Sequence, residues 1–391
     1  MLLPMCLQDS HTQLRWDEVQ AASTVSKDRP RTVEGLTPGH GTLAFFAGCS
    51  LIFNLRFGVT IALSHTKPSS GGTDMKVGIV GAGQVGSACF LSMVMRGSAR
   101  EVVLVNRDRK RAKGVVTDVQ YGAVLSPPMT LRDGDYSDLA GSSVVMITAG
   151  VNEKAGGATD RSDPVGRLRL LDANATVFQE IVPQIHQFAP DALILVVTDP
   201  PDALADVVRI LGHERVLSTG TSLDTLRFRF HLGKRLNVSA SDVEALVLGE
   251  HGASEVFLWS SARVGDRKVL DLFGESQTAE TVREEIEREV RYANITVIEG
   301  IGASQYGIGM VSARLTEMIL RDEGAVIPIG CYNPTFGVTL SLPSVVGREG
   351  VRRVLEPEMS AAEQQGLQRS ADAIKAALSR LSLKESQRRT A

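Results

Sequence analysis

The chain has 391 residues, which is enough for two domains that each bury a hydrophobic core. Apolar residues make up 43% and charged residues 22%, the balance of an ordinary globular protein, and the formal net charge is -3. This charge does not indicate nucleic acid or an anionic membrane as a partner. The four cysteines are scattered and form no C-x-x-C pair, which argues against a disulfide framework or a zinc site and indicates a reducing compartment such as the cytoplasm.

Residues 1–74 match no alternation of strands and helices. They end in a Ser/Gly-rich stretch, 68–72, just before Met75. An apolar run over 42–63 is interrupted by Asn54 and Arg56, and a charge near the middle argues against a membrane span. The run also lies too far from the start of the chain for a signal peptide. We therefore expect a leader that is disordered, or sequence upstream of a true start at Met75.

From Met75 onward, short apolar runs alternate with stretches of helical periodicity. Strands are predicted at 76–80, 102–105, 144–148, 192–197 and 216–219, and helices at 85–95, 109–121, 170–188 and 203–211. This alternation is typical of βαβ units, in which helices cover both faces of a parallel sheet. It predicts a first domain over 75–219.

After residue 220 the pattern changes. A long charged helix is predicted over 282–297, antiparallel strands over 325–329 and 338–342, and a last helix that begins at a Ser360/Glu363 capping box. The expected fold is therefore a doubly wound α/β domain with a parallel sheet, followed by a mixed α+β domain over 220–391.

A glycine motif follows the first of these strands. Residues 81–86 read G-A-G-Q-V-G, a G-x-G-x-x-G match that follows a predicted strand and begins a predicted helix. Gly81 permits a tight turn, Gly83 lets the backbone approach a pyrophosphate, and Gly86 permits close packing of the helix on the sheet. Gln84 and Val85 begin the helix, whose free N–H groups suit an anion. The first domain is thus predicted to be a Rossmann-type nucleotide-binding domain.

The end of the second strand bears on which dinucleotide is bound. An acidic residue is expected there, about 20 residues after the glycines, to bind the ribose hydroxyl. This chain has Asn106, followed by Arg107 and Arg109. An amide would not repel the 2′-phosphate of NADP, and arginines could pair with it, so NADP is possible beside NAD. Alternatively, Asn106 binds the ribose and the arginines are solvated. Thr148, Ala149 and Gly150, which end the third strand, are further cofactor-binding candidates.

A second motif combines acid–base groups. His251 lies in the turn Gly249-Glu250-His251-Gly252 after an apolar run, and its ordinary pKa suits proton transfer near neutral pH. Asp224 and Arg227 are three residues apart, so on a helix they face the same side.

These motifs, in this order, resemble the lactate/malate dehydrogenases over about residues 75–381. The resemblance implies hydride transfer between a nicotinamide cofactor and C2 of a small L-2-hydroxy or 2-oxo acid. It implies that His251 transfers the proton, that Asp224 orients His251 and raises its pKa, and that Arg227 binds the substrate carboxylate. Arg167 matches the arginine that polarises the C2 carbonyl, and Ser304 falls where the family usually has a substrate-lining threonine.

One departure from the family lies at Asp199-Pro200, where the family usually has Asn-Pro. An amide can donate a hydrogen bond toward the substrate, whereas an ionised aspartate can only accept one. Asp199 could be protonated in the site, could lose the contact, or could turn outward. It is expected to be a site residue, and these three roles stay open.

A second departure is a long loop over 151–166, which suits a lid that closes over substrate. The position that separates lactate-type from malate-type members lies early in this loop. Alignment places Glu153 there, or Arg161 if the insertion is put earlier. Glu153 would repel a second substrate carboxylate, and Arg161 would attract it. Asn174, on the helix that follows, is also expected at the substrate site.

The preferred interpretation is an L-lactate dehydrogenase-like enzyme acting on a monocarboxylic acid, with malate dehydrogenase as the alternative. A catalytically inactive NAD(P)-binding regulator is a different class, which Asn106 and Asp199 favour and the intact set of charged residues argues against. Copies of the same chain are the expected macromolecular partners, in a homodimer or homotetramer.

Overall fold

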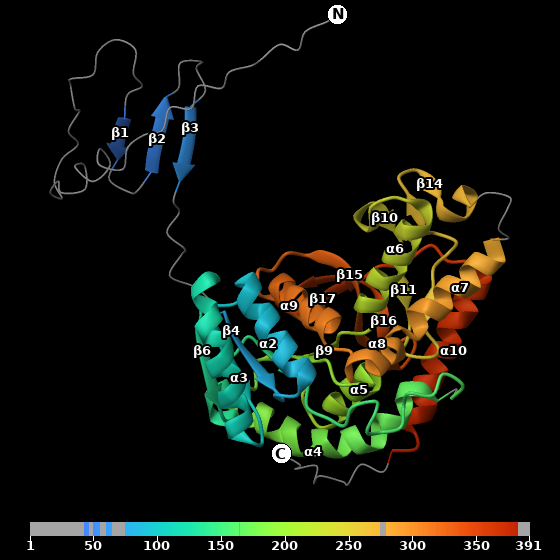
Figure 1. Cartoon of the computed structure of the whole chain (residues 1–391), viewed down its shortest axis with the longest axis horizontal. Coiled ribbons are helices and arrows are strands. Elements are labelled where there is room, and N and C mark those ends of the chain that lie inside the picture. Colours follow the sequence, from blue (N-terminus) through green and yellow to red (C-terminus); the bar gives the residue numbers. More distant parts are fainter. Residues whose placement is uncertain are drawn as a thin grey trace, which may run out of the picture. The chain divides into compact units, whose positions relative to one another are not determined.

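The computed structural model describes residues 43–46, 50–54, 60–64, 75–163, 165–273 and 279–381 (Figure 1). The chain divides into two compact units, residues 1–72 and residues 73–391. Within the described residues, no helix is long and apolar enough to cross a membrane.

The first unit contains a small antiparallel sheet. Its strands are β1 (Leu43–Phe46), β2 (Ser50–Asn54) and β3 (Thr60–Ser64), and they pair in the order β1-β2-β3. The expectation of disorder was therefore wrong for these three segments, because the apolar run pairs its backbone groups within two successive hairpins. The rest of the leader lies outside the described residues.

The second unit is built on a nine-stranded sheet with the order β17-β16-β15-β9-β8-β7-β4-β5-β6. The strands from β4 to β9 are parallel and match the alternation seen in the sequence. They are β4 (Lys76–Val80), β5 (Glu101–Val105), β6 (Thr130–Gly134), β7 (Val144–Ile147), β8 (Leu193–Val196) and β9 (Val216–Ser218). The chain runs outward from β4 to β6, returns to β7 on the other side of β4, and so leaves a crevice at the carboxyl ends of β4 and β7.

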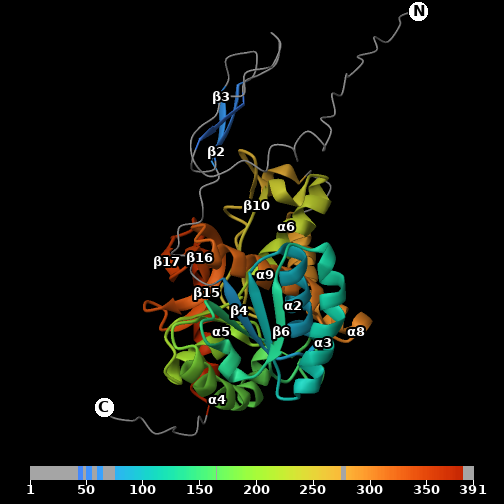
Figure 2. The same ribbon diagram turned by 90° about the vertical axis from the view of Figure 1, so that its left-hand side faces the viewer.

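Both faces of the central strands of this sheet are buried, which explains their continuous apolar runs. In β5, Val102 and Leu104 belong to one hydrophobic core, and Val103 and Val105 belong to the other. Helices α2 (Gln84–Arg96), α3 (Arg109–Gly122) and α9 (Tyr306–Leu320) cover the first face, and Figure 2 shows α2 and α3 beside the strands. Helices α4 (Leu171–Phe188), α5 (Pro201–Ile210) and α10 (Ala361–Leu378) cover the second.

The second half of the chain extends the same sheet. Strands β15 (Ala325–Asn333), β16 (Val338–Gly347) and β17 (Gly350–Val354) are antiparallel, and β15 pairs with β9 at Gly330 and Ser218. The sequence predicted these strands to belong to a following domain, but the sheet is continuous across the two halves. Helix α10 begins at the predicted capping box of Ser360 and Glu363.

The remaining helices and strands lie in the second half of the chain. They are α6 (Ser222–Leu236), the short strands β10 (Val243–Glu244), β11 (Val247–Leu248), β12 (Val256–Phe257), β13 (Arg263–Val264) and β14 (Arg267–Lys268), and helices α7 (Ala279–Arg291) and α8 (Ala293–Ile301). The predicted single helix over 282–297 is therefore two helices. Helix α7 ends at Arg291, and α8 begins after Tyr292.

Candidate active site

The glycine loop lies between β4 and α2, at the crevice of the parallel sheet. The Gly81 N–H donates to the carbonyl of Val105, and the Thr148 hydroxyl donates to the Gly81 carbonyl at 2.9 Å. Helix α2 begins after Gly83, and no side chain caps its first turn. The N–H groups of this turn are therefore available to an external acceptor such as a phosphate.

The glycines fit a dinucleotide for two different reasons. A Cβ added at Gly86 would lie 1.8 Å from the Gly81 carbonyl oxygen, so helix and loop can approach this closely only at a glycine. A Cβ added at Gly83 would meet nothing within 4 Å. The space beside Gly83 is open toward the cleft that it lines, as a backbone that lies against a pyrophosphate requires.

Asn106 has two partners within the chain. Its Oδ1 accepts from the Ala82 N–H at 2.9 Å, and its Nδ2 donates to the Asp108 carbonyl at 3.0 Å. Asn106 thus ties the end of β5 to the glycine loop. Arg109 pairs with Asp133 at 3.0 Å, whereas Arg107 is exposed in the same turn.

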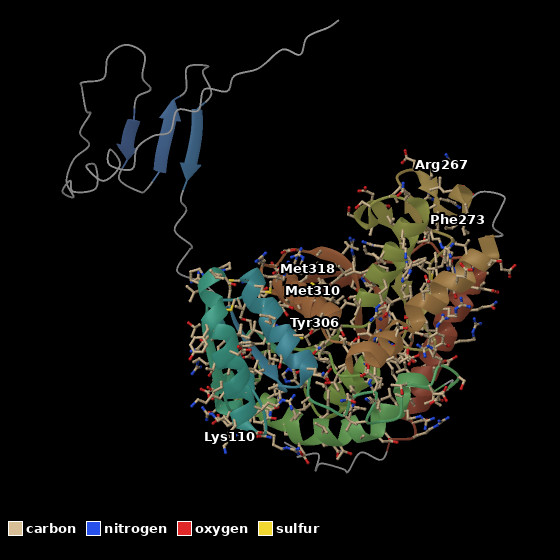
Figure 3. The ribbon with its side chains drawn as sticks, viewed as in Figure 1. Lys110, Arg267, Phe273, Tyr306, Met310 and Met318 are labelled. Atoms are coloured by element: carbon tan, nitrogen blue, oxygen red, sulfur yellow. The ribbon has the colours of Figure 1, made fainter. Side chains whose placement is uncertain are left out.

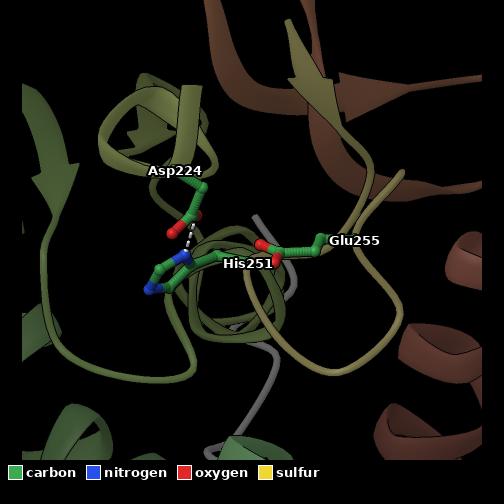
Figure 4. A group of neighbouring side chains, drawn as sticks. All are labelled: Asp224, His251 and Glu255. Atoms are coloured by element: carbon green, nitrogen blue, oxygen red, sulfur yellow. Dashed lines mark hydrogen bonds and ion pairs between the residues drawn. The ribbon is translucent and has the colours of Figure 1, made fainter. Parts of the chain in front are cut away.

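The acid–base groups meet on the far side of the cleft. Asp224 and Arg227 lie one helical turn apart in α6, and Arg227 Nη1 donates to Asp224 Oδ1 at 2.9 Å. The other oxygen of Asp224, Oδ2, forms a hydrogen bond with Nδ1 of His251, as Figure 4 shows. The Nε2 atom of His251 is left facing the cleft, 3.7 Å from Asp199 Oδ1. The imidazole is therefore oriented so that Nε2 can exchange a proton with a bound molecule.

The electrostatics of this pair differ in one respect from the expectation. Burial alone would raise the pKa of Asp224, but the neighbouring His251 and Arg227 outweigh it and lower this pKa. The pKa of His251 is lowered, because burial and the charge of Arg167 outweigh the opposite effect of Asp224. The expected effect of Asp224, which raises the pKa of His251, is present, but burial and Arg167 decide the direction of the net shift. Asp224 favours the imidazolium, but the buried site as a whole favours the neutral ring.

Arg167 lies across the cleft from His251, on the 3₁₀ turn Gly166–Leu170 that follows the long loop. Its side chain is only 7% exposed, and its buried Nε has no hydrogen-bond partner within the described residues. That Nε lies 3.6 Å from Asp199 Oδ2. A buried guanidinium N–H without a partner is costly, so this group is placed to receive an oxygen from a bound molecule.

Asp199 has turned inward and lines the cleft. Burial raises its pKa well above the ordinary value. A hydrogen bond with Glu153 and the charges of Glu153 and Asp224 act in the same direction, and Arg167 acts against them. The backbone carbonyl of Asp199 accepts from Asn174 Nδ2 at 2.6 Å. The sequence left three roles open for Asp199, and the structure excludes the one in which its side chain turns outward.

Glu255 is turned toward the Asp224–His251 pair (Figure 4). Burial, together with the charge of Asp224, raises its pKa well above the ordinary value. One ligand atom from each of these three residues lies within 4.8 Å of the others, so the group could hold a metal ion by distance alone. The hydrogen bond between His251 Nδ1 and Asp224 instead fits the orientation of an acid–base imidazole.

The structure brings most of the predicted residues to one cleft. Those that line it are Gly83, Gln84, Val85, Thr148, Gly150, Glu153, Arg167, Asp199, Arg227, His251 and Ser304. Gly81 and Asp224 lie behind this lining and bond the lining residues Thr148 and His251. Gly86 lies close to the Gly81 carbonyl, and Asn106 bonds the Ala82 backbone in the glycine loop. Ala149 packs against the hydrophobic core, and Arg107 is exposed on the surface.

Arg161 and Asn174 do not line the cleft. Arg161 forms a two-pronged ion pair with Glu299 of α8, at 2.6 and 2.8 Å, on the outside of the long loop. Asn174 is buried on α4 and bonds both Val151 at the start of the loop and the backbone of Asp199. It positions these two segments. Pro164, within the loop, lies outside the described residues.

Sequence reasoning missed several residues that belong to the site, among them Asp202 and Asn294. Asp202, in the first turn of α5, accepts from the backbone N–H of His251 at 2.7 Å, and burial raises its pKa to about 7. Asn294 of α8 lines the cleft although it is far away in sequence. Each carries a polar side chain in an apolar segment, but that signal does not indicate which site the side chain joins.

Comparison with known proteins agrees with this geometry. Residues 75–215 match the family model described as lactate/malate dehydrogenase, NAD binding domain, and residues 221–383 match its alpha/beta C-terminal domain. An L-lactate dehydrogenase of Deinococcus radiodurans is 43% identical over 305 residues, 77% of this chain and 97% of that protein. One from Thermus aquaticus is 43% identical over 317 residues, 78% and 99% of the two chains. The crystal structure of a lactate dehydrogenase from a Medee basin deep-sea metagenome library has 32% identity and a TM-score of 0.71, and covers 78% of this chain and 98% of that one.

A dinucleotide loop beside a buried His–Asp pair and two arginines defines an NAD-dependent dehydrogenase. The matched domains cover both halves of the second unit in the same order. The chain belongs to the lactate/malate dehydrogenase family.

Proposed function

We propose that the chain reduces and oxidises a monocarboxylic L-2-oxo/2-hydroxy acid, as an L-lactate dehydrogenase does. The observation that carries the choice of substrate is that Glu153 lines the cleft whereas Arg161 is paired with Glu299 outside it. A second substrate carboxylate would meet the negative charge of Glu153 and would find no cation at Arg161. This arrangement disfavours malate and oxaloacetate.

The residues act on the substrate in three ways. Arg227 binds the substrate carboxylate, and its pairing with Asp224 holds the guanidinium in place. Arg167 presents its unpartnered Nε to the C2 oxygen, where negative charge develops during reduction. His251 Nε2 gives its proton to that oxygen during reduction and accepts it during oxidation. The nicotinamide cofactor, when bound, supplies or accepts the hydride at C2.

A panel of 2-oxo acids tests the substrate class. Initial rates of NADH oxidation are measured with pyruvate, 2-oxoisocaproate and oxaloacetate at equal concentrations. We expect pyruvate or 2-oxoisocaproate to give the higher kcat/KM. A kcat/KM for oxaloacetate about tenfold above the others would contradict the proposal, because that difference needs a favourable contact with the second carboxylate.

The cofactor is proposed to be NAD, with NADP also accepted. No carboxylate at position 106 repels a 2′-phosphate, and Arg107 is exposed in the same turn. The same panel, repeated with NADPH, measures this preference. A kcat/KM for NADH more than about 100-fold above that for NADPH would rule out the second cofactor.

An inactive nucleotide-binding regulator predicts a different result for His251→Asn. In the proposed enzyme this change removes the proton donor and lowers kcat by roughly 10²–10⁴-fold. Titration with NADH should give the same affinity as the unchanged protein, because His251 lies on the far side of the cleft from the glycine loop. A regulator would show no turnover before or after the substitution.

We further propose that the chain assembles with copies of itself. Helix α9 contacts both α2 and α6, and the three helices expose large apolar side chains, namely Leu91, Met95, Leu226, Phe230, Tyr306 and Met310. Tyr306 and Met310, on α9, are labelled in Figure 3. An exposed apolar patch of this kind is typical of an interface between subunits.

A further inference from the structure

Two carboxyl groups face each other inside the cleft, next to the groups that bind the C2 oxygen. Asp199 follows β8, and Glu153 lies on the loop over 151–166. The two side chains form a hydrogen bond. A hydrogen bond between two carboxyl groups requires a proton on one of them, since ionised carboxylates only accept.

The surroundings of Asp199 make its charge important. Its Oδ2 lies 3.6 Å from Arg167 Nε, and its Oδ1 lies 3.7 Å from His251 Nε2. Both distances are too long for hydrogen bonds, so both nitrogens stay available. In agreement with this distance, the buried Arg167 Nε has an ion-pair neighbour in Asp199 but no hydrogen-bond partner within the described residues. An ionised Asp199 in this position would attract Arg167, and also His251 when it is protonated, and would occupy the place of the substrate oxygen.

Other charged groups around Asp199 act in both directions. Asp224 of α6 and Glu153 of the loop disfavour a second negative charge, and Arg167 of the 3₁₀ turn favours it. His251, from the turn after β11, would favour it when protonated. Asn174 of α4 bonds the backbone carbonyl of Asp199 and not its side chain. It therefore fixes the position of Asp199 without favouring either protonation state of the carboxyl group.

We propose that Asp199 works as a neutral acid, with its proton directed at Glu153, and that this neutrality keeps Arg167 and His251 free for the C2 oxygen of the substrate. The two acids then carry one negative charge between them, on the loop side of the cleft. Asp199 and Glu153 are positioning residues, since they act through Arg167 and His251. This inference rests on the proposed function of the same site.

The inference makes opposite predictions for the two acids. Asn at position 199 donates its amide to Glu153 and cannot ionise. Gln at position 153 donates its amide to Asp199 and stabilises the ionised form, since the neighbouring negative charge is also gone. In Asp199→Asn the cleft stays open to substrate at every pH. In Glu153→Gln an ionised Asp199 competes with the substrate at a lower pH than before.

The test is the pH dependence of kcat/KM for oxidation of the L-2-hydroxy acid, which requires neutral His251 and so rises with pH. In the unchanged enzyme we expect a fall at higher pH as Asp199 loses its proton. We expect Asp199→Asn to lack this fall and Glu153→Gln to show it at lower pH, with KM raised by about 10-fold or more and kcat changed less. The double variant should regain the KM of Asp199→Asn. Asp172→Asn, the same change on an exposed residue of α4, is the control and should match the unchanged enzyme.

Infrared spectroscopy gives a readout that needs no turnover. Because other buried carboxyl groups such as Glu255 and Asp202 also have raised pKa values, the readout is a difference spectrum. The unchanged enzyme minus Asp199→Asn should show the C=O band of one protonated carboxyl group that disappears at high pH, and the unchanged enzyme minus Asp172→Asn should show no such band. An alkaline fall that is identical in the unchanged enzyme and Asp199→Asn, or an infrared band unaffected by Asp199→Asn, would overturn the inference. Absence of turnover with every 2-oxo acid would instead refute the proposed function, and the infrared result would still decide the protonation of Asp199.

Discussion

At the scale of single residues, the site depends on which groups are buried and on what they face. Burial and the charge of Arg167 lower the pKa of His251, and Asp224 acts in the opposite direction. The same low-polarity surroundings raise the pKa of Asp199. A base that becomes neutral more easily and an acid that keeps its proton both reduce the charge buried in the cleft.

The lowered pKa of His251 predicts opposite pH dependences for the two directions of the reaction. Reduction needs the imidazolium, so its kcat/KM should fall as pH rises through the pKa of His251. Oxidation needs the neutral ring, so its kcat/KM should rise through the same pH. Both changes should be centred below pH 6.5, the ordinary pKa of histidine. Initial rates in both directions with the free enzyme measure this pKa, and a midpoint above the ordinary value would contradict the electrostatic account.

At the scale of elements, two glycines in the turn from β4 to α2 have different roles, one in stability and one in cofactor binding. Gly86→Ala places a methyl group against the Gly81 carbonyl, so it should lower the free energy of unfolding by about 1–3 kcal/mol and weaken NADH binding as well. Gly83→Ala meets nothing in the free protein and has an ordinary backbone φ of -72°. It should leave the melting temperature unchanged and still weaken NADH binding by about tenfold or more, because its methyl group projects into the pyrophosphate space.

Thermal unfolding without cofactor and fluorescence titration with NADH distinguish these two effects. Unchanged NADH binding by Gly83→Ala would show that the open space beside Gly83 does not hold the cofactor, and a loss of stability equal to that of Gly86→Ala would contradict the absence of a steric contact at Gly83.

The long loop is a second element with a testable attachment. Arg161 ties it to Glu299 of α8, and both side chains are about half exposed. An exposed ion pair is screened by solvent and contributes little to stability, so Arg161→Ala should change the melting temperature little. We expect the loop to close over substrate, with this ion pair holding the loop against α8. Loss of the pair in Arg161→Ala should therefore raise KM a few-fold. Arg267→Ala, at an exposed arginine on β14 labelled in Figure 3, is the matched control and should leave KM as it is.

At the scale of the whole molecule, one sheet links cofactor binding to the substrate groups. Strand β15 pairs with β9, and Ser341 of β16 exchanges backbone hydrogen bonds with Gly249, two residues before His251. The antiparallel strands therefore hold the His251 turn at a fixed distance from the end of the parallel sheet. This continuity explains how residues from α6, the β11 turn and the long loop converge on one cleft.

The exposed apolar patch on α2, α6 and α9 predicts the assembly state. Met310 is 57% exposed on α9, and Met310→Arg should place a charge in the interface and shift the protein toward a smaller species. Leu125→Arg, at a 94% exposed residue after α3 and outside the patch, should leave the assembly unchanged. Size-exclusion chromatography with light scattering measures both masses. A monomeric mass for the unchanged protein would refute the proposed interface.

The sequence by itself determined the local features of this protein. The apolar runs of β4, β5, β7 and β8 predicted a parallel sheet, because strands buried on both faces need apolar residues at every position. The glycine spacing predicted the dinucleotide loop, and the i, i+3 spacing of Asp224 and Arg227 predicted their shared helix face. Each of these follows from steric or periodic constraints that act within a few residues.

Only the tertiary structure decided the features that depend on distant neighbours. It placed Glu153 in the cleft and Arg161 outside it, and it joined β15 to β9 in one sheet. It also set the pKa of His251 and of Asp199, since burial and the charges of Arg167 and Glu153 come from segments far apart in the chain. Electrostatic energies inside a protein depend on distance and on the loss of water, and neither quantity is encoded by spacing along the sequence.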